Sequence, residues 1–356
     1  MKKRFFIILS IILLTLLTSF VYFYDELVSN TPLILTTSEK TIITSVLEQT
    51  IDPSKNCLYS SAMQIAWNKF TNDFFKETIE IENQPEYIEK LNKHLNELPN
   101  VSEDSYKAIL SIHDKDSIQK INDDLKSHFS NYYLNPINSN GIVAYASIFK
   151  EFSFDNKFES FESKIKFSST EIEIKSFGIE KYEDTEYQKK LANQVLIHYY
   201  EHDKPGYKYF VFELKTNSSE DSIIISNFIP QNTMLKSFEL INSKIIAAMA
   251  AEQGNLDSLI IPKMNFKIIH RYYDLINKNI KNKTHNNLYF SDAITNISFK
   301  IDESCIKFSS FFEMTLLAND PRLNINGPFF IYLINKNFKT PYFMAYIGND
   351  ELLIKK

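Results

Sequence analysis

The sequence predicts a mixed α+β domain preceded by one apolar N-terminal segment. Apolar residues recur at helical spacing through the first third of the chain, the period becomes strand-like from Asn140, and Gly141 is the first of only six glycines. The composition is 44% hydrophobic and 14% aromatic over 356 residues, which is enough for a large core and excludes a low-complexity chain. We therefore expect helices in the N-terminal part packed on large mixed or antiparallel sheets.

Residues 1–25 are expected to meet a membrane as a signal anchor or signal peptide. Phe5 to Tyr24 is a run of twenty uncharged residues that follows Lys2, Lys3 and Arg4. As a helix, such a run spans about 30 Å, the hydrocarbon thickness of a bilayer. The cationic flank predicts a cytoplasmic N-terminus and export of the rest of the chain. An uncleaved anchor is favoured because no alanine precedes Ala62; if the segment is cleaved instead, the protein is secreted.

The remaining elements follow from apolar spacing and from cap and turn residues. Residues 26–38 are expected to form a linker and 39–350 a single domain, since no repeat of 20 to 50 residues is visible. Helices are expected at 39–51, 85–98, 102–112, 116–129 and 232–252, with a short strand running into a helix at 56–67. Strands are expected at 142–150, 165–177, 194–200, 207–214, 222–229, within 259–275, and at 328–334 and 341–347.

The tail of the chain carries the most distinctive pattern. A strand ends at Ile301-Asp302-Glu303, a connection of about twenty-five residues follows, and Pro328-Phe329 opens a hairpin whose second strand begins at Pro341. The six residues between the two strands include Asn335, Lys336, Asn337 and Lys339, which are typical of a turn. We expect this tail to close the sheet-rich body.

This tail resembles the C-terminus of the serpin family, in which a strand with an acidic end feeds the reactive loop and a Pro-Phe pair leads into two buried strands. Other landmarks follow in the family's order from about residue 40 to 348: Asn56, Ser60, Ala146, Phe149, Lys150, Phe158, and Ile261 to Leu275. Ser61 and Met63 depart from the pattern, since the family has proline and serine there. The resemblance implies a serpin-like fold and membership of a superfamily of serine endopeptidase inhibitors.

Within the resemblance, the loop hinge falls on Glu303, Ser304, Cys305, Ile306, Lys307 and Phe308. Inhibitory serpins carry small residues here, because the cleaved loop enters the main sheet as a new strand. The bulky residues of this chain predict that the segment is already packed as a strand and that protease trapping is lost; contact with a partner or a membrane is the alternative. If the loop is bait after all, cleavage is expected among Thr315, Leu316, Leu317, Ala318 and Asn319.

No motif for catalysis or for a cofactor is visible. The chain lacks a nucleophile elbow, a phosphate loop and closely spaced cysteines, and His198 and His202 have no third metal ligand nearby in the sequence. Cys57 and Cys305 are expected to be lone thiols rather than a disulfide. A net charge of −5 does not favour nucleic acid.

Three functions remain open from the sequence. The favoured one is a membrane-anchored, extracytoplasmic serpin-like protein that is not an enzyme, needs no cofactor or metal, and acts as a non-inhibitory binding or structural module. The alternatives are a working inhibitor of an extracytoplasmic serine or cysteine protease and an unrelated membrane-anchored enzyme. The expected partners are the membrane, through residues 5–24, and a protease or another protein.

Overall fold

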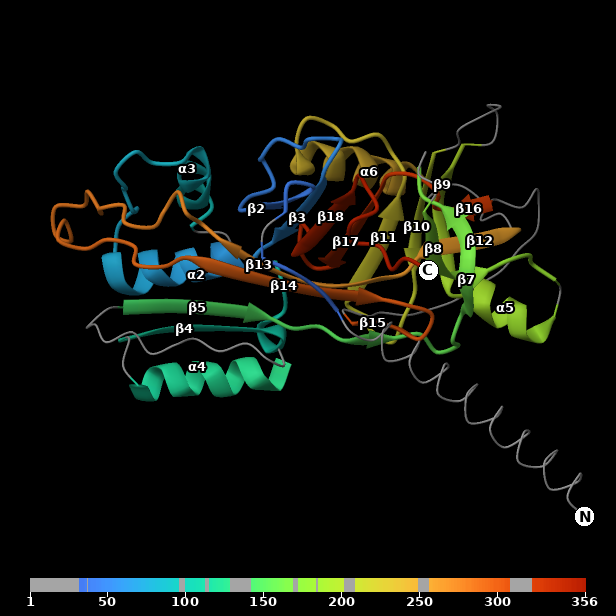
Figure 1. Ribbon diagram of the computed structural model, residues 1–356, viewed down its shortest axis with the longest axis horizontal. Helices are drawn as coiled ribbons and strands as arrows, with labels where there is room; N and C mark the ends of the chain where they lie inside the picture. Colours follow the sequence, from blue (N-terminus) through green and yellow to red (C-terminus); the bar gives the residue numbers. More distant parts are fainter. Residues whose placement is uncertain are drawn as a thin grey trace, which may run out of the picture.

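The computed structural model describes residues 32–36, 38–95, 100–112, 115–128, 142–168, 172–183, 185–201, 209–248, 256–307 and 322–356. Within these residues, strands form four sheets and a few helices cover them (Figure 1). The predicted α+β class, with helices on large mixed and antiparallel sheets, is confirmed.

The largest sheet has seven strands in the order β2-β3-β18-β17-β11-β10-β9. Their bounds are β2 Thr41–Thr44, β3 Asn56–Ser60, β9 Val195–Tyr200, β10 Phe210–Leu214, β11 Asp221–Ser226, β17 Phe329–Asn335 and β18 Phe343–Ile347. The predicted C-terminal hairpin is confirmed, since β17 and β18 pair antiparallel at the centre of this sheet. Every residue of β18 is buried, so the tail closes the body of the protein.

A second sheet has the order β1-β13-β14-β15-β6 and holds the expected hinge. Its strands are β1 Leu33–Leu35, β6 Phe152–Ser153, β13 Met264–Arg271, β14 Ile294–Ile301 and β15 Cys305–Lys307. The two larger sheets share one core, in which Phe299 of β14 stacks on Phe343 of β18 with ring centroids 5.1 Å apart. Both rings are almost fully buried.

Two smaller sheets complete the body. One has the order β16-β12-β8-β7, with β7 Glu159–Lys166, β8 Glu173–Ile179, β12 Ser258–Pro262 and β16 Arg322–Asn324; the other pairs β4 Tyr106–Ile112 with β5 Ile142–Ile148. Gly178 of β8 has a positive φ of 145°, and a side chain there would collide with the Leu259 carbonyl of β12. Glycine is required at this crossing because only it tolerates both conditions.

The helices pack against several of the sheets. They are α2 Ala62–Lys69, α3 Glu86–Lys93, α4 Lys115–His128, α5 Glu186–Ala192 and α6 Met234–Ala248, with a π-helix at Phe70–Phe75 and a 3-10 turn, η2, at Glu103–Ser105. Helix α2 contacts β4 and β5, whereas α6 packs on β9 and β10. The predicted helices at 85–98, 116–129 and 232–252 are present in the described residues as α3, α4 and α6.

Two predicted helices are wrong. Within 39–51 the chain forms the parallel strand β2, and within 102–112 it forms η2 and then β4. Short apolar runs suit either structure, and here a partner strand decides. In 41–44 two threonines and two isoleucines, all β-branched, also favour the extended form.

The predicted anchor or signal segment, 1–25, lies outside the described residues. Leu33–Leu35 falls inside the predicted linker and forms β1, paired in parallel with β13. Among the residues that the structure describes, no helix has the length and apolar character needed to cross a bilayer.

Candidate functional site at the turn after β14

A tight turn links β14 to β15 at the position that the sequence predicted for the hinge. The Asp302 amide donates to the Cys305 carbonyl at 3.0 Å. Asp302 Oδ1 accepts hydrogen bonds from the amides of Ser304 at 2.9 Å and Cys305 at 3.1 Å. An aspartate that bonds the amides of the following residues favours a turn at this point, so the acidic motif has a structural role.

Asp302 is held in its charged form. Burial alone would raise the pKa of this carboxyl, but Lys300 Nζ at 2.7 Å and the two turn amides outweigh that effect and lower it. Charge-assisted hydrogen bonds of this kind are stronger than neutral ones. The turn therefore depends on the ionised carboxylate.

Glu303 ties the turn to two other segments. Its carboxylate lies 2.5 Å from Lys263 Nζ, just before β13, and 3.5 Å from Lys157 Nζ. The Lys263 ammonium also donates to Ser160 Oγ at 2.7 Å. Since the Glu303 and Lys263 side chains are only 15% and 11% exposed, this ion pair is shielded from salt. The Glu303 carbonyl accepts from the Phe158 amide at 2.8 Å, which fixes the backbone as well.

Strand β15 lies between two other strands. Residues 306 and 307 pair antiparallel with β14, in the register Ile301 with Ile306 and Lys300 with Lys307. On the other side, Cys305 pairs with Ser153 and Ile306 with Phe152 of β6. The first residues after the acidic motif are therefore built into the five-stranded sheet.

The structure places five of the six predicted hinge residues at this turn and strand, from Glu303 to Lys307. Phe308 and the candidate cleavage residues Thr315 to Asn319 lie outside the described residues. Both cysteines are free thiols, as expected: Cys57 is buried in β3 and Cys305 is half-buried in β15. Burial raises the pKa of Cys57 to about 11.

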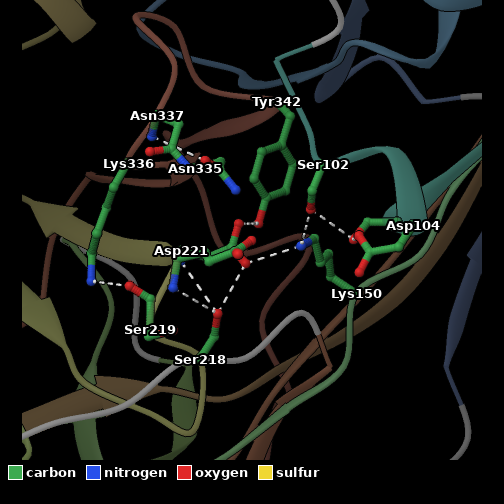
Figure 2. Close-up of polar contacts among 12 residues, drawn as sticks. Ser102, Asp104, Lys150, Ser218, Ser219, Asp221, Asn335, Lys336, Asn337 and Tyr342 are labelled. Atoms are coloured by element: carbon green, nitrogen blue, oxygen red, sulfur yellow. Dashed lines mark hydrogen bonds and ion pairs between the residues drawn. The ribbon is translucent and has the colours of Figure 1, made fainter.

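A buried polar network, which the sequence did not reveal, fixes the other side of β15. Figure 2 shows Asp221 at the start of β11, receiving hydrogen bonds from Lys150 Nζ at 3.0 Å, Ser218 Oγ at 3.1 Å and Tyr342 Oη at 3.2 Å. The Lys150 ammonium also donates to Ser102 Oγ at 3.0 Å. The Asp221 side chain is 2% exposed, and burying it without hydrogen-bond partners would be costly.

This network fixes the strand beside β15. Lys150 follows β5 and precedes β6 by two residues, so its ion pair holds the start of β6 against the seven-stranded sheet. Ser153 of β6 exchanges backbone and side-chain hydrogen bonds with Asn217, both at 3.3 Å. The sequence pointed to Lys150 only as a landmark of the resemblance, and it did not single out Asp221, whose one visible signal is an acidic side chain close before the apolar run Ile223 to Ile225.

Two pairs of polar side chains in the described part of the chain have the residue types of catalytic groups, and each is tied up in an ion pair. Ser102 and Lys150 lie within hydrogen-bond distance, as in a serine–lysine dyad, but the Lys150 ammonium is also paired with Asp221 at 3.0 Å. His198 Nε2 lies 3.1 Å from Glu213 Oε2, a pairing that occupies the histidine. The described residues contain no group of three histidine, cysteine or acidic side chains that could hold a metal ion.

Known proteins resemble this chain in structure and not in sequence. No family model and no curated protein matches the sequence. Thyroxine-binding globulin in complex with thyroxine is 14% identical, with a TM-score of 0.48 over 83% of this chain and 93% of that chain. Tengpin, a thermophilic serpin in its native state, is 14% identical, with a TM-score of 0.48 over 84% and 90%. Human glycosylated kallistatin is 13% identical, with a TM-score of 0.49 over 83% and 92%.

Serpins are thus among the solved structures that this chain resembles. Each TM-score is below 0.5, so the likeness adds nothing to what the strand order and contacts of this chain support by themselves. Those contacts agree with the predicted resemblance: β14 runs through an acidic turn into β15, and the hairpin after Pro328 lies inside the body. The described residues thus form several sheets with a few helices around them, the arrangement that the resemblance implied.

Proposed function

We propose that this chain is a serpin-like protein, held outside the cytoplasm by residues 5–24, that acts as a binding or structural module without catalysis or protease trapping. One observation supports the non-inhibitory role. An inhibitor of the kind that the resemblance implies draws its loop into the main sheet after cleavage, whereas β15 already lies between β14 and β6 in the uncut chain.

Side-chain size supports the same role. The segment continues from β15 with Phe308, Phe311 and Phe312, and each bulky group forced into a packed sheet costs about 1 to 3 kcal/mol. Insertion has to be fast and favourable to trap a protease before it completes hydrolysis. Several such misfits would slow or prevent it.

An inhibitor remains the second candidate, because β15 is only three residues long. In the described part of the chain, the edge of β14 that pairs with β15 has no strand partner along Ile294–Phe299. Strand β5 likewise has a described partner on one edge only, which is β4. A longer inserted strand would pair with this edge. In that case Leu316 or Leu317 is the residue that the protease reads.

A protease panel distinguishes the two candidates. The intact chain is treated with serine and cysteine proteases, the cut is located by mass spectrometry, and thermal unfolding is compared before and after cleavage. A module cut between Thr315 and Asn319 should show no rise in Tm and form no SDS-resistant complex. A clear rise in Tm together with such a complex would overturn the proposed non-inhibitory role.

A matched variant tests whether side-chain size is the reason. Replacing Phe308, Phe311 and Phe312 with alanine should allow the cut chain to gain heat stability, while the parent does not. Tyr289→Ala, at a residue that is 58% exposed elsewhere, serves as the control for loss of an aromatic ring. If the alanine variant behaves like the parent after cleavage, bulk at the hinge is not what prevents insertion.

A further inference from the structure

Strand β1 fixes where the chain enters the five-stranded sheet. It runs parallel to β13, with Leu33 beside Phe266 and Leu35 beside Ile268. Met264, at the start of β13, pairs with Ile301, at the end of β14. The chain therefore enters the sheet at the end that carries the Asp302–Cys305 turn.

The outer edge of β1 is apolar and exposed. Leu33 is 41% and Ile34 is 58% exposed, and as neighbours in a strand they point to opposite faces, so apolar surface runs along the edge itself. Residues 29–38 contain no charged side chain. Edge strands in water are usually protected by charged side chains. Strand β7, at the edge of its own sheet, carries four of them: Glu159, Glu162, Lys164 and Lys166.

The segment that joins the uncharged run to β1 is short. Eight residues, 25–32, separate Tyr24, the last of the uncharged run, from Leu33. Fully extended, they reach roughly 30 Å, whereas a domain of this size is roughly 50 Å across. A bilayer that holds residues 5–24 must therefore lie on the side of the domain where β1 is found.

We infer that the β1 edge, with Leu33 and Ile34, rests on the lipid surface, so that the turn end of the five-stranded sheet faces the membrane. This inference rests on the membrane attachment in the proposed function. Lipid accounts for both the missing charge and the exposed apolar pair, because an interfacial segment buries such side chains at the boundary of headgroups and acyl chains. A partner of the hinge would then be a molecule at or in the same membrane.

Lipid quenching of tryptophan tests the orientation. The full chain is reconstituted in phosphatidylcholine vesicles containing brominated phosphatidylcholine, as the parent and as the variants Ile34→Trp and Ile246→Trp. Ile246 is the matched control, since it is 62% exposed but lies on α6, which packs on the seven-stranded sheet. The parent's single tryptophan, Trp67, is 3% exposed and provides the background signal.

The added tryptophan at position 34 should lose about half of its emission, as expected for a ring within 5 to 10 Å of the headgroup boundary, while the one at 246 keeps its emission. Leu33→Trp repeats the measurement if the first variant misfolds. Vesicle flotation separates the two ideas: a chain that does not float disproves the attachment, whereas a floating chain with equal quenching at 34 and 246 disproves the orientation. If Ile34→Asp converts a dimer into a monomer in detergent, a second copy covers the edge and the inference is wrong.

Discussion

Replacing Lys150 by methionine should destabilise the whole domain through the buried carboxylate that it leaves behind. In the folded protein the Lys150 ammonium lies 3.0 Å from Asp221, and the two side chains are 11% and 2% exposed. Methionine keeps most of the side-chain volume but removes the charge. Asp221 then loses this ammonium group, and its remaining partners include the hydroxyl groups of Ser218 and Tyr342.

The expected loss follows from this environment. Breaking a buried ion pair by removing one partner costs about 3 to 5 kcal/mol, and the hydrogen bonds that Asp221 keeps place this case near 3 kcal/mol. For a domain of about 300 residues, 3 kcal/mol corresponds to a fall in Tm of about 5 °C. The double variant with Asp221→Asn removes both charges and should recover part of the loss, because residues in contact are not additive.

Thermal unfolding followed by circular dichroism measures these changes. Lys189→Met is the control, because the Lys189–Glu186 pair is exposed on α5 and its loss should leave Tm unchanged. A fall of less than about 1 °C for Lys150→Met would show that the network contributes little. Strictly additive losses in the double variant would show that the two charges do not depend on each other.

Three further predictions test individual contacts. The pKa of Asp302 is lowered in the folded state, so the stability that its carboxylate contributes is complete above about pH 4 and is lost as the pH falls through the folded-state pKa. The difference in Tm between the parent and Asp302→Asn should therefore be constant from pH 7 to 5 and become smaller below pH 5. A difference that grows in acid would contradict this prediction. Asn282→Ala should cost about 2 kcal/mol, since the buried amide bridges two backbone groups at 2.9 and 2.8 Å, whereas the exposed Asn286→Ala should cost nothing measurable in urea unfolding. With a thiol reagent at pH 8, Cys305 should react in the folded state while Cys57, fully buried with a pKa of about 11, reacts only on unfolding; two equally fast thiols would refute this.

The sequence alone predicted the features that depend on local pattern. The hairpin after Pro328 could be predicted because two apolar runs flank a short polar turn, and both strands are present as β17 and β18. The acidic motif Asp302-Glu303 was placed at a strand end by the family resemblance and not by local pattern, and β14 does end beside it, at Ile301. The prediction that Phe5 to Tyr24 meets a membrane likewise depends only on the length of this run and on its lack of charge.

Only the tertiary structure decided which residues meet across the chain. Residues 39–51 and 102–112 have apolar spacing that suits a helix, yet β2 and β4 are strands because each gains a partner strand that no local pattern reveals. Lys150 and Asp221 are 71 positions apart, and their ion pair exists because the chain brings β5 to the start of β11. Local spacing sets what a segment can form, whereas burial and pairing with distant segments select among those forms, since most of the stabilising free energy comes from contacts between elements.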